Sequence, residues 1–298
     1  MNNIDKLFEA VGAKGHVCVG LDTSVEYVPP ASRRQSSSDA EAVLAFNRAL
    51  VDATFDACAC YKVQIAYYEE MGMEGLSVYA KTLRYIREIG GLVIADIKRG
   101  DIADTALRYA KAHFAGDFEA DFVTLSPYMG MDSIEPWIAY AESNGKGAFV
   151  LMRTSNKGMR DFEYLELSSG KKRLYHAVGD KLAELADAHK GIHGYGVFGA
   201  VVGCTEKDEA AEIRKNYSNL FFLIPGYGAQ GGAADDAALL LREGNGGVVN
   251  ASRSILKAWE AELNKSGGDV SAATTSFAAE AARRAAIEMR DAIRAAVR

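Results

Sequence analysis

The sequence has little proline, few cysteines, no long apolar run and no excess of basic residues. Its 298 residues include 5 Pro, far fewer than a collagen-like repeat requires. No apolar run approaches the roughly 20 residues that span a bilayer, and we expect no signal peptide because no apolar core follows a basic start. Lys and Arg number 34 against 40 Asp and Glu, a net charge of −6. This balance argues against a general binder of nucleic acid or anionic membranes.

The few cysteines lack the spacing of a redox or zinc site. Cys58 and Cys60 are separated by one residue, whereas both motifs need a two-residue spacer and a zinc site needs a second pair. We expect all four cysteines to be buried free thiols in a reducing cytoplasm. The other two are Cys18 and Cys204.

Patterns for metal ligands and for activated nucleophiles are missing as well. His189 and His193 have the spacing of helical metal ligands, but Gly191 and Gly194 interrupt a helix there. No Gly-x-Ser-x-Gly elbow is present. We therefore expect no metal site, and we expect Lys and Asp side chains to carry the chemistry.

What is present is an ordinary globular composition with alternating elements. Apolar residues make up 49% of the chain, and its length suits two average domains or one large α/β barrel. Short apolar runs bounded by Gly or polar residues are typical of strands buried on both faces. They lie at 17–21, 61–65, 92–95, 121–125, 147–152, 195–202, 220–224 and 247–250. Because helical patterns alternate with them and no linker divides the chain, we predict a single-domain (β/α)8 TIM barrel over 1–298. A doubly wound open sheet is the alternative.

Helical spacing fills the segments between these runs. The predicted helices include 39–57, with Asp39 as N-cap, 132–143, 205–217 and 233–242. The charged stretch 155–179 is longer than an ordinary connection, so we interpret it as a loop insertion. The alanine-rich end, 276–298, has the pattern of an amphipathic helix that packs on the barrel.

The segment 94–102 carries the most informative polar residues. Asp96 and Lys98 follow an apolar strand and, because strand side chains alternate, point the same way. In a barrel, catalytic groups gather at this carboxyl end. Asp101 lies just beyond Gly100, and two acids around one lysine keep its ammonium charged and directed. A surface ion-pair cluster is the alternative, and the apolar strand leading into the motif argues against it.

Polar residues end or interrupt other apolar strands in the same way. Asp22 follows the run 17–21, and Lys62 shares a strand face with Gln64. A lysine within an apolar strand is costly unless it meets an anion or hydroxyl groups. We interpret Lys62 as a site residue, with a core ion pair as the alternative.

A glycine-rich loop, 226–232, lies between the seventh strand and a helix. Its glycines match the dinucleotide pattern G-x-G-x-x-G, but that motif should open the first βα unit. Loops after strands seven and eight are the usual phosphate site of these barrels, and glycines before a helix expose N–H groups to an anion. Arg253 can supply a bidentate clamp and Gln230 a neutral donor. These features predict a phosphorylated small substrate, with a purely structural loop as the alternative.

These motifs together resemble the orotidine 5′-phosphate decarboxylase family. Residues 96–102 resemble its D-x-K-x-x-D-I signature, with Thr105 downstream. The other similar segments follow in order across nearly the whole barrel, as in the longer subgroup of the family: 20–22, 61–64, 126–130, 153–156, 225–230 and 252–253. Two departures, Ala103 for a frequent Gly and Val63 for a frequent Pro, replace no polar group.

The resemblance implies a cofactor-free conversion of orotidine 5′-phosphate to UMP and carbon dioxide, a step of pyrimidine biosynthesis, on a homodimeric barrel. It implies that Lys98 protonates C6 of the pyrimidine and that Asp96 lies near the departing carboxylate. It also implies that Asp101, with Ile102 and Thr105, reaches the neighbouring subunit's site.

The resemblance also assigns the contacts to the substrate. They are Asp22 and Lys62 for the ribose, Ser155 for the pyrimidine, Gln230 and Arg253 for the phosphate, and Pro225 and Ser252 as further binding residues.

Two other functions stay open. A Mg²⁺-dependent sugar-phosphate decarboxylase or aldolase of the same barrel suprafamily has a similar D-x-K-x-x-D motif, although the segment 154–156 argues against it. A catalytically silent binder of nucleotide phosphates could dispense with Lys98 and both aspartates.

Overall fold

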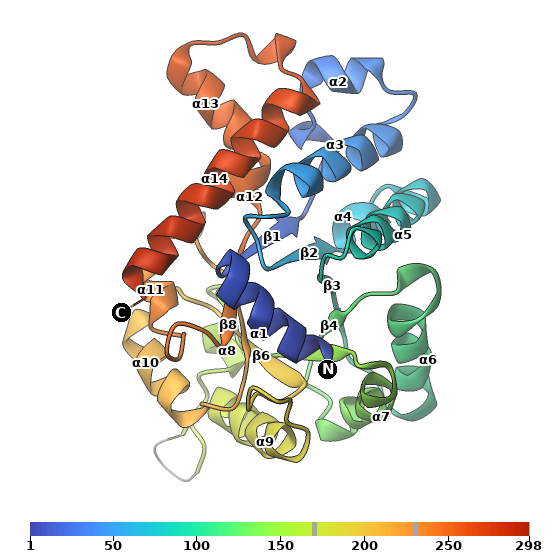
Figure 1. Ribbon diagram of the computed structural model, residues 1–298. Coiled ribbons are helices and arrows are strands. Elements are labelled where there is room, and N and C mark those ends of the chain that lie inside the picture. Colours follow the sequence, from blue (N-terminus) through green and yellow to red (C-terminus); the bar gives the residue numbers. More distant parts are fainter. Residues whose placement is uncertain (169–171, 229–231, 298) are drawn as a thin grey trace.

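The fold is a closed barrel of eight parallel strands (Figure 1). The computed structural model describes residues 1–168, 172–228 and 232–297. The strands pair in chain order, and β8 returns to pair with β1, with Val17 opposite Val249. They are β1 Val17–Leu21, β2 Cys60–Gln64, β3 Val93–Arg99, β4 Phe122–Leu125, β5 Gly147–Arg153, β6 Phe198–Val202, β7 Phe222–Ile224 and β8 Gly247–Ala251. The predicted (β/α)8 barrel is confirmed, and the open sheet is wrong.

The strands are short and apolar because neither face meets water. Every residue of β1, β4, β6 and β7 is buried, since helices cover the outside and side chains fill the inside. The predicted runs match the strands apart from their ends. The main difference is that β3 continues to Arg99, so it contains both Asp96 and Lys98.

Helices follow the strands and surround the barrel (Figure 1). The longer ones are α1 Asn3–Lys14, α3 Asp39–Thr54, α5 Gly72–Glu88, α6 Ala103–Phe114, α7 Glu135–Asn144, α9 Leu174–Ala188, α10 Lys207–Asn216, α13 Ala258–Ser266 and α14 Thr275–Ala296. Shorter elements are α2 Pro30–Gln35, α4 Ala66–Glu69, α8 Met159–Phe162, α11 Ala234–Ala238, α12 Arg253–Leu256, and the 3-10 helices η1 Val25–Tyr27, η2 Gly116–Phe118, η3 Met131–Ser133 and η4 Val270–Ala272. In the part of the chain that the structure describes, no helix is long and apolar enough to cross a membrane.

Two predicted helix boundaries are wrong for local reasons. Ser38, not Asp39, is the N-cap of α3, because its hydroxyl accepts a hydrogen bond from the Glu41 amide at 3.2 Å. The predicted helix 233–242 ends early, at Ala238. A turn follows it closely, in which Arg242 and Asn245 exchange backbone hydrogen bonds.

The remaining predicted helical segments differ less. The segment 132–143 is divided into η3 and α7, with Pro136 in the first turn of α7, where proline is favourable. The segment 205–217 corresponds to α10, and 276–298 corresponds to α14. The stretch 155–179 contains α8 and the beginning of α9.

Helix α1 closes the amino-terminal end of the barrel and lies across the strands in Figure 1. Asn3 Nδ2 donates to Asp121 Oδ1 at 3.0 Å, just before β4. Asn245 Nδ2 donates to the carbonyl of Phe8 at 3.1 Å, just before β8. Helix α1 therefore leaves the opposite end, at the carboxyl ends of the strands, uncovered.

Candidate active site

A cavity of about 440 Å³ opens at the carboxyl ends of the strands. Its volume is that of a small-molecule site. It brings together predicted residues from opposite sides of the barrel: Asp22, Lys62, Asp96, Lys98, Ser155, Pro225, Ser252 and Arg253. These positions span most of the chain, so the barrel closure is what makes them neighbours.

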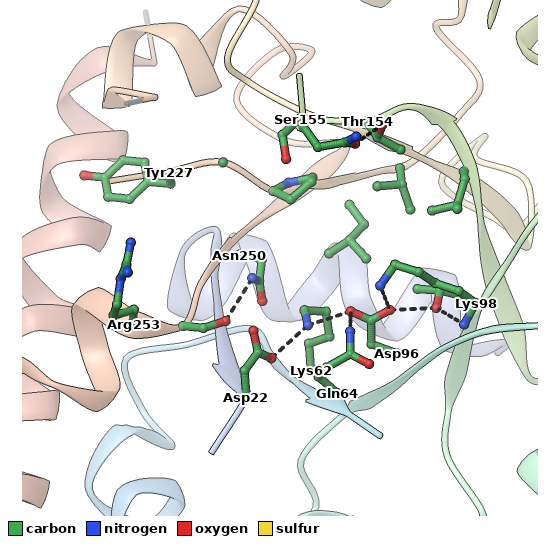
Figure 2. Close-up of a pocket in the computed structure, with 18 of the residues that line it drawn as sticks. Asp22, Lys62, Gln64, Asp96, Lys98, Thr154, Ser155, Tyr227, Asn250 and Arg253 are labelled. Atoms are coloured by element: carbon green, nitrogen blue, oxygen red, sulfur yellow. Dashed lines mark hydrogen bonds and ion pairs between the residues drawn. The ribbon is translucent and has the colours of Figure 1, made fainter. Parts of the chain in front are cut away.

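Asp96 is the centre of the polar network on the cavity floor (Figure 2). Lys98 Nζ donates to its Oδ1 at 2.6 Å, and Lys62 Nζ donates to its Oδ2 at 2.7 Å. Gln64 Nε2 and Thr124 Oγ1 donate at 3.0 and 2.9 Å. Burial would raise the pKa of the Asp96 carboxyl, but the two ammonium groups outweigh it and hold that pKa well below its usual range. Asp96 is therefore an anion at neutral pH.

Lys62 lies between two carboxylates. Its Nζ is 3.1 Å from Asp22 Oδ1 as well as 2.7 Å from Asp96 Oδ2. Burial would lower the pKa of Lys62, but these carboxylates raise it above its ordinary value. The two interpretations of Lys62 are thus not exclusive, because it forms a buried ion pair and also lines the cavity.

Lys98 reaches Asp96 through an irregular end of β3. The pairing of β3 with β4 shifts register between Ala95 and Arg99, and Lys98 has a φ of 44°. The amides of Ile97 and Lys98 donate to Thr124 Oγ1 at 3.0 and 2.9 Å. Regular alternation therefore does not describe this position. A non-glycine residue at positive φ is strained, and such strain persists where the surroundings fix it.

Asp101, Ile102 and Thr105 are the predicted residues that lie outside the cavity of their own chain. Asp101 is half-buried, and its Oδ1 accepts a hydrogen bond from the Ile102 amide at 2.9 Å. Ile102 and Thr105 are exposed. Within one chain, the third charged residue that joins Asp96 and Lys98 is therefore Lys62, which pairs with Asp96. It is not Asp101.

Arg253 stands at the other end of the cavity from Lys98 (Figure 2), and Tyr227 lines the same cavity. Arg253 is the first residue of α12 and is separated from β8 by Ser252 alone. Gly226 and Gly228 have φ values of 104° and 69°, which explains the need for glycine in this loop. Gln230 lies outside the described residues.

The position of the neighbouring residue Ser252 requires a glycine in β1. A Cβ at Gly20 would stand 2.0 Å from Ser252 Oγ, so β1 has room for Ser252 only because residue 20 is glycine.

Among the described residues, no three His, Cys, Asp or Glu side chains gather in the manner of metal ligands.

The sequence matches the family model described as "Orotidine 5′-phosphate decarboxylase / HUMPS family" over residues 15–264. This range contains every strand of the barrel and every residue of the cavity. The chain belongs to this family.

Curated relatives within the decarboxylase family match the chain over nearly its full length. A Clostridium perfringens protein named orotidine 5′-phosphate decarboxylase is 56% identical over 294 residues, which cover 98% of both chains. One of the same name from Clostridium acetobutylicum is 54% identical over 291 residues, again 98% of both chains.

Solved structures agree with this membership. The structure of Leishmania donovani OMP decarboxylase has a TM-score of 0.77 and 31% identity, and the match covers 100% of this chain and 99% of that one. Leishmania donovani UMP synthase gives a TM-score of 0.76 and 33% identity over 99% of this chain, but the chain spans only 57% of that protein.

The sequence prediction of this decarboxylase-family site missed several polar residues of the cavity. Gln64 and Thr124 bind Asp96, and Asn250 Nδ2 donates to Ser252 Oγ at 3.4 Å. Each is a polar residue within an apolar strand, the signal that identified Lys62. Tyr27 and Tyr67 also line the cavity, but they lie outside the strands, where no periodicity identifies them.

Proposed function

We propose that this protein decarboxylates orotidine 5′-phosphate to UMP and carbon dioxide without a cofactor, as a step of pyrimidine biosynthesis, with Lys98 as the proton donor to C6. The family membership and the names of its full-length relatives support the reaction. The observation that carries the mechanism is the row of charges Lys98–Asp96–Lys62–Asp22 along the cavity floor.

The chemistry of the substrate suits this row. Loss of carbon dioxide leaves a carbanion at C6 in the ring plane, where the π system delocalises it poorly. An ammonium already held in place is a natural stabiliser for that charge and then a source of the proton. Asp96 orients Lys98 by accepting a hydrogen bond from its Nζ. We assign Asp96 to the neighbourhood of the departing carboxylate.

Remote binding energy is needed as well. Enzymes of very slow reactions lower the barrier by about 20 kcal/mol, more than one ion pair supplies. We assign Arg253 and Gln230 to the phosphate, so that their binding energy positions the ring at Lys98. Asp22 and Lys62 would hold the ribose between these ends, Ser155 the pyrimidine, and Pro225 and Ser252 line the path. The cavity, with Arg253 and Lys98 at opposite ends, supports this orientation.

We further propose a homodimer in which Asp101, Ile102 and Thr105 complete the neighbouring subunit's site. Support comes from exposed apolar side chains on the segments that follow the neighbouring strands β3 and β4, since exposed apolar patches mark interaction surfaces. They are Ile102, Leu107, Tyr128 and Met129, which are 41 to 83% exposed in the single chain. We propose the cytoplasm as the compartment, which the four free thiols support.

Loss of orotidine 5′-phosphate absorbance, followed with EDTA present, tests the reaction. We expect turnover that EDTA leaves unchanged. A reaction that stops with EDTA and returns with Mg²⁺ would instead favour the metal-dependent sugar-phosphate enzymes. Binding of UMP without turnover would favour a silent nucleotide-binding protein.

A further inference from the structure

The segment 155–179 begins at Ser155, on the wall of the cavity, and folds back onto the residue before it. The carboxylate of Glu163 accepts hydrogen bonds from the Thr154 amide at 2.8 Å and from Thr154 Oγ1 at 2.7 Å. One side chain of the insertion thus binds Thr154 at two points.

Glu163 is itself held in place by contacts between the insertion and α10. Arg160 pairs with Glu206 at 2.8 Å, and Tyr164 Oη donates to Glu209 Oε2 at 2.6 Å. These contacts flank Glu163 in sequence on both sides. The acceptor of Thr154 is therefore fixed to the barrel and is not carried on a free loop.

Ser155 is confined from its other side by the end of β6. A Cβ at Gly203 would stand 2.8 Å from Ser155 Cβ and 3.0 Å from Ser155 Cα. The Gly203 amide donates to the Arg153 carbonyl at 2.8 Å, and the Arg153 guanidinium donates to the Gly203 carbonyl. Ser155 thus packs against Gly203 on one side. In sequence it follows Thr154, which two hydrogen bonds to Glu163 hold in place.

We propose that Glu163 is a positioning residue, which sets Ser155 at the pyrimidine through its double hydrogen bond to Thr154. The insertion then has a function in the reaction, although none of its residues after Asn156 lines the cavity in the part of the chain that the structure describes. The inference rests on the proposed contact between Ser155 and the pyrimidine.

A substitution at Glu163 distinguishes an effect of position on kcat/KM from an effect of charge. In Glu163→Leu no side-chain oxygen remains, so both hydrogen bonds from Thr154 are lost. Removing a negative charge near an anionic substrate would by itself favour binding, so a loss of kcat/KM must come from position. Small misplacements of reacting groups cost large factors, and we expect a decrease of about tenfold or more.

The decisive experiment is a double-mutant cycle with Ser155→Ala, read as kcat/KM for orotidine 5′-phosphate. If Glu163 acts through Ser155, Glu163→Leu should lower kcat/KM about tenfold in the wild type and less than about twofold in Ser155→Ala. The matched control is Lys172→Gln in the same insertion, which removes an exposed ion pair to Asp180 of α9. Its kcat/KM should stay within about twofold of the wild type.

Equal losses in both backgrounds, or no loss in either, overturn the inference. An unchanged kcat/KM in Ser155→Ala overturns it together with the assignment of Ser155, while decarboxylation by the wild type still stands. If Glu163→Leu does not fold, Thr154→Val replaces it in the same cycle with the same expected outcomes. It removes the hydroxyl bonds to Glu163 and Asn156 and keeps the bond from the Thr154 amide.

Discussion

The carboxylate of Asp96 binds two ammonium groups that differ in exposure, and this difference separates their roles. The Lys98 side chain is 48% exposed, whereas that of Lys62 is 8% exposed. Lys62 can therefore neutralise Asp96 in the folded protein when Lys98 is absent, but it has no freedom to replace Lys98 at the substrate.

We predict that Lys98→Ala abolishes turnover and leaves the fold intact. The variant lacks both the proton source and the counter-charge of the carbanion, so kcat should fall by a factor of at least about 10³. Because Lys62 still neutralises Asp96, we expect Tm to change by only a few degrees, or about 1 kcal/mol. Steady-state kinetics and a thermal melt measure both, with Lys181→Ala on α9 as a control. Retention of a tenth of the wild-type kcat would contradict this role.

His113 makes stability depend on pH. It is buried in α6, and its Nδ1 has no hydrogen-bond partner among the described residues. Burial, with a contribution from the charge of Arg99, lowers its pKa from 6.5 to about 4. Between these values the unfolded chain takes up a proton that the folded chain does not. The stability that neutral His113 contributes is therefore complete above pH 6.5 and decreases as the pH falls toward 4.

We predict that His113→Phe, which cannot titrate, loses less stability on acidification than the wild type. Between pH 7 and pH 4.5 the difference in the loss of unfolding free energy should be about 2 kcal/mol. Urea denaturation of both proteins at the two pH values measures it. Parallel decreases in the two proteins would show that His113 titrates normally in the folded state.

At the scale of elements, the irregular end of β3 depends on a hydroxyl from β4. Thr124 is 1% exposed, and its Oγ1 accepts from two amides and donates to Asp96. We predict that Thr124→Val destabilises the protein by about 2–3 kcal/mol, because buried amides lose their acceptor. Lys98 should move as well, so kcat should fall with it.

The matched control is Thr54→Val in α3. Thr54 is also buried, but its hydroxyl donates within its own helix, to the Leu50 carbonyl. Urea denaturation should show a lower free energy of unfolding in both variants, whereas only Thr124→Val should lower kcat. A Thr124→Val enzyme with wild-type kcat would mean that Lys98 keeps its position without this hydroxyl.

The same strand shows what the sequence predicts and what it does not. Apolar runs of the right length and spacing predict the barrel. Polar residues at the ends of these runs or within them predict Asp22, Lys62, Asp96 and Lys98. The positive φ of Lys98 does not follow from local sequence, because Thr124, from another strand, stabilises it. For this reason, hydrogen bonds between distant segments cannot be predicted from sequence periodicity.

Other residues escaped prediction for the same physical reason. Gly20 and Gly203 are needed because Ser252 and Ser155 approach them from distant parts of the chain. The N-cap of α3 is a local feature, but adjacent Ser38 and Asp39 both suit it, and only the hydrogen bond to Glu41 decides between them.

At the scale of the whole molecule, the proposed dimer makes a test by complementation possible. Lys98→Ala and Asp101→Ala homodimers should each turn over substrate poorly. In a mixed dimer one site receives both defects and the other neither. With random exchange and two-fold symmetry, half of the molecules are mixed, so about a quarter of all sites should regain activity.

The mixing experiment needs verified exchange of subunits, for example by mass spectrometry of differently tagged chains. Activity that does not return after exchange would place the action of Asp101 within its own subunit. Mixing Lys98→Ala with Lys98→Ala that carries the second tag is the control, and should remain inactive.

The pairing of β8 with β1 also has a consequence during synthesis. Val17 and Val249 are neighbours in the finished barrel, but the ribosome makes them more than two hundred residues apart. Until the last strand emerges, β1 and the most recent strand each present an unpaired edge, and such edges promote aggregation. The nascent chain is therefore exposed to aggregation from the pairing of its first strands until β8 closes the ring.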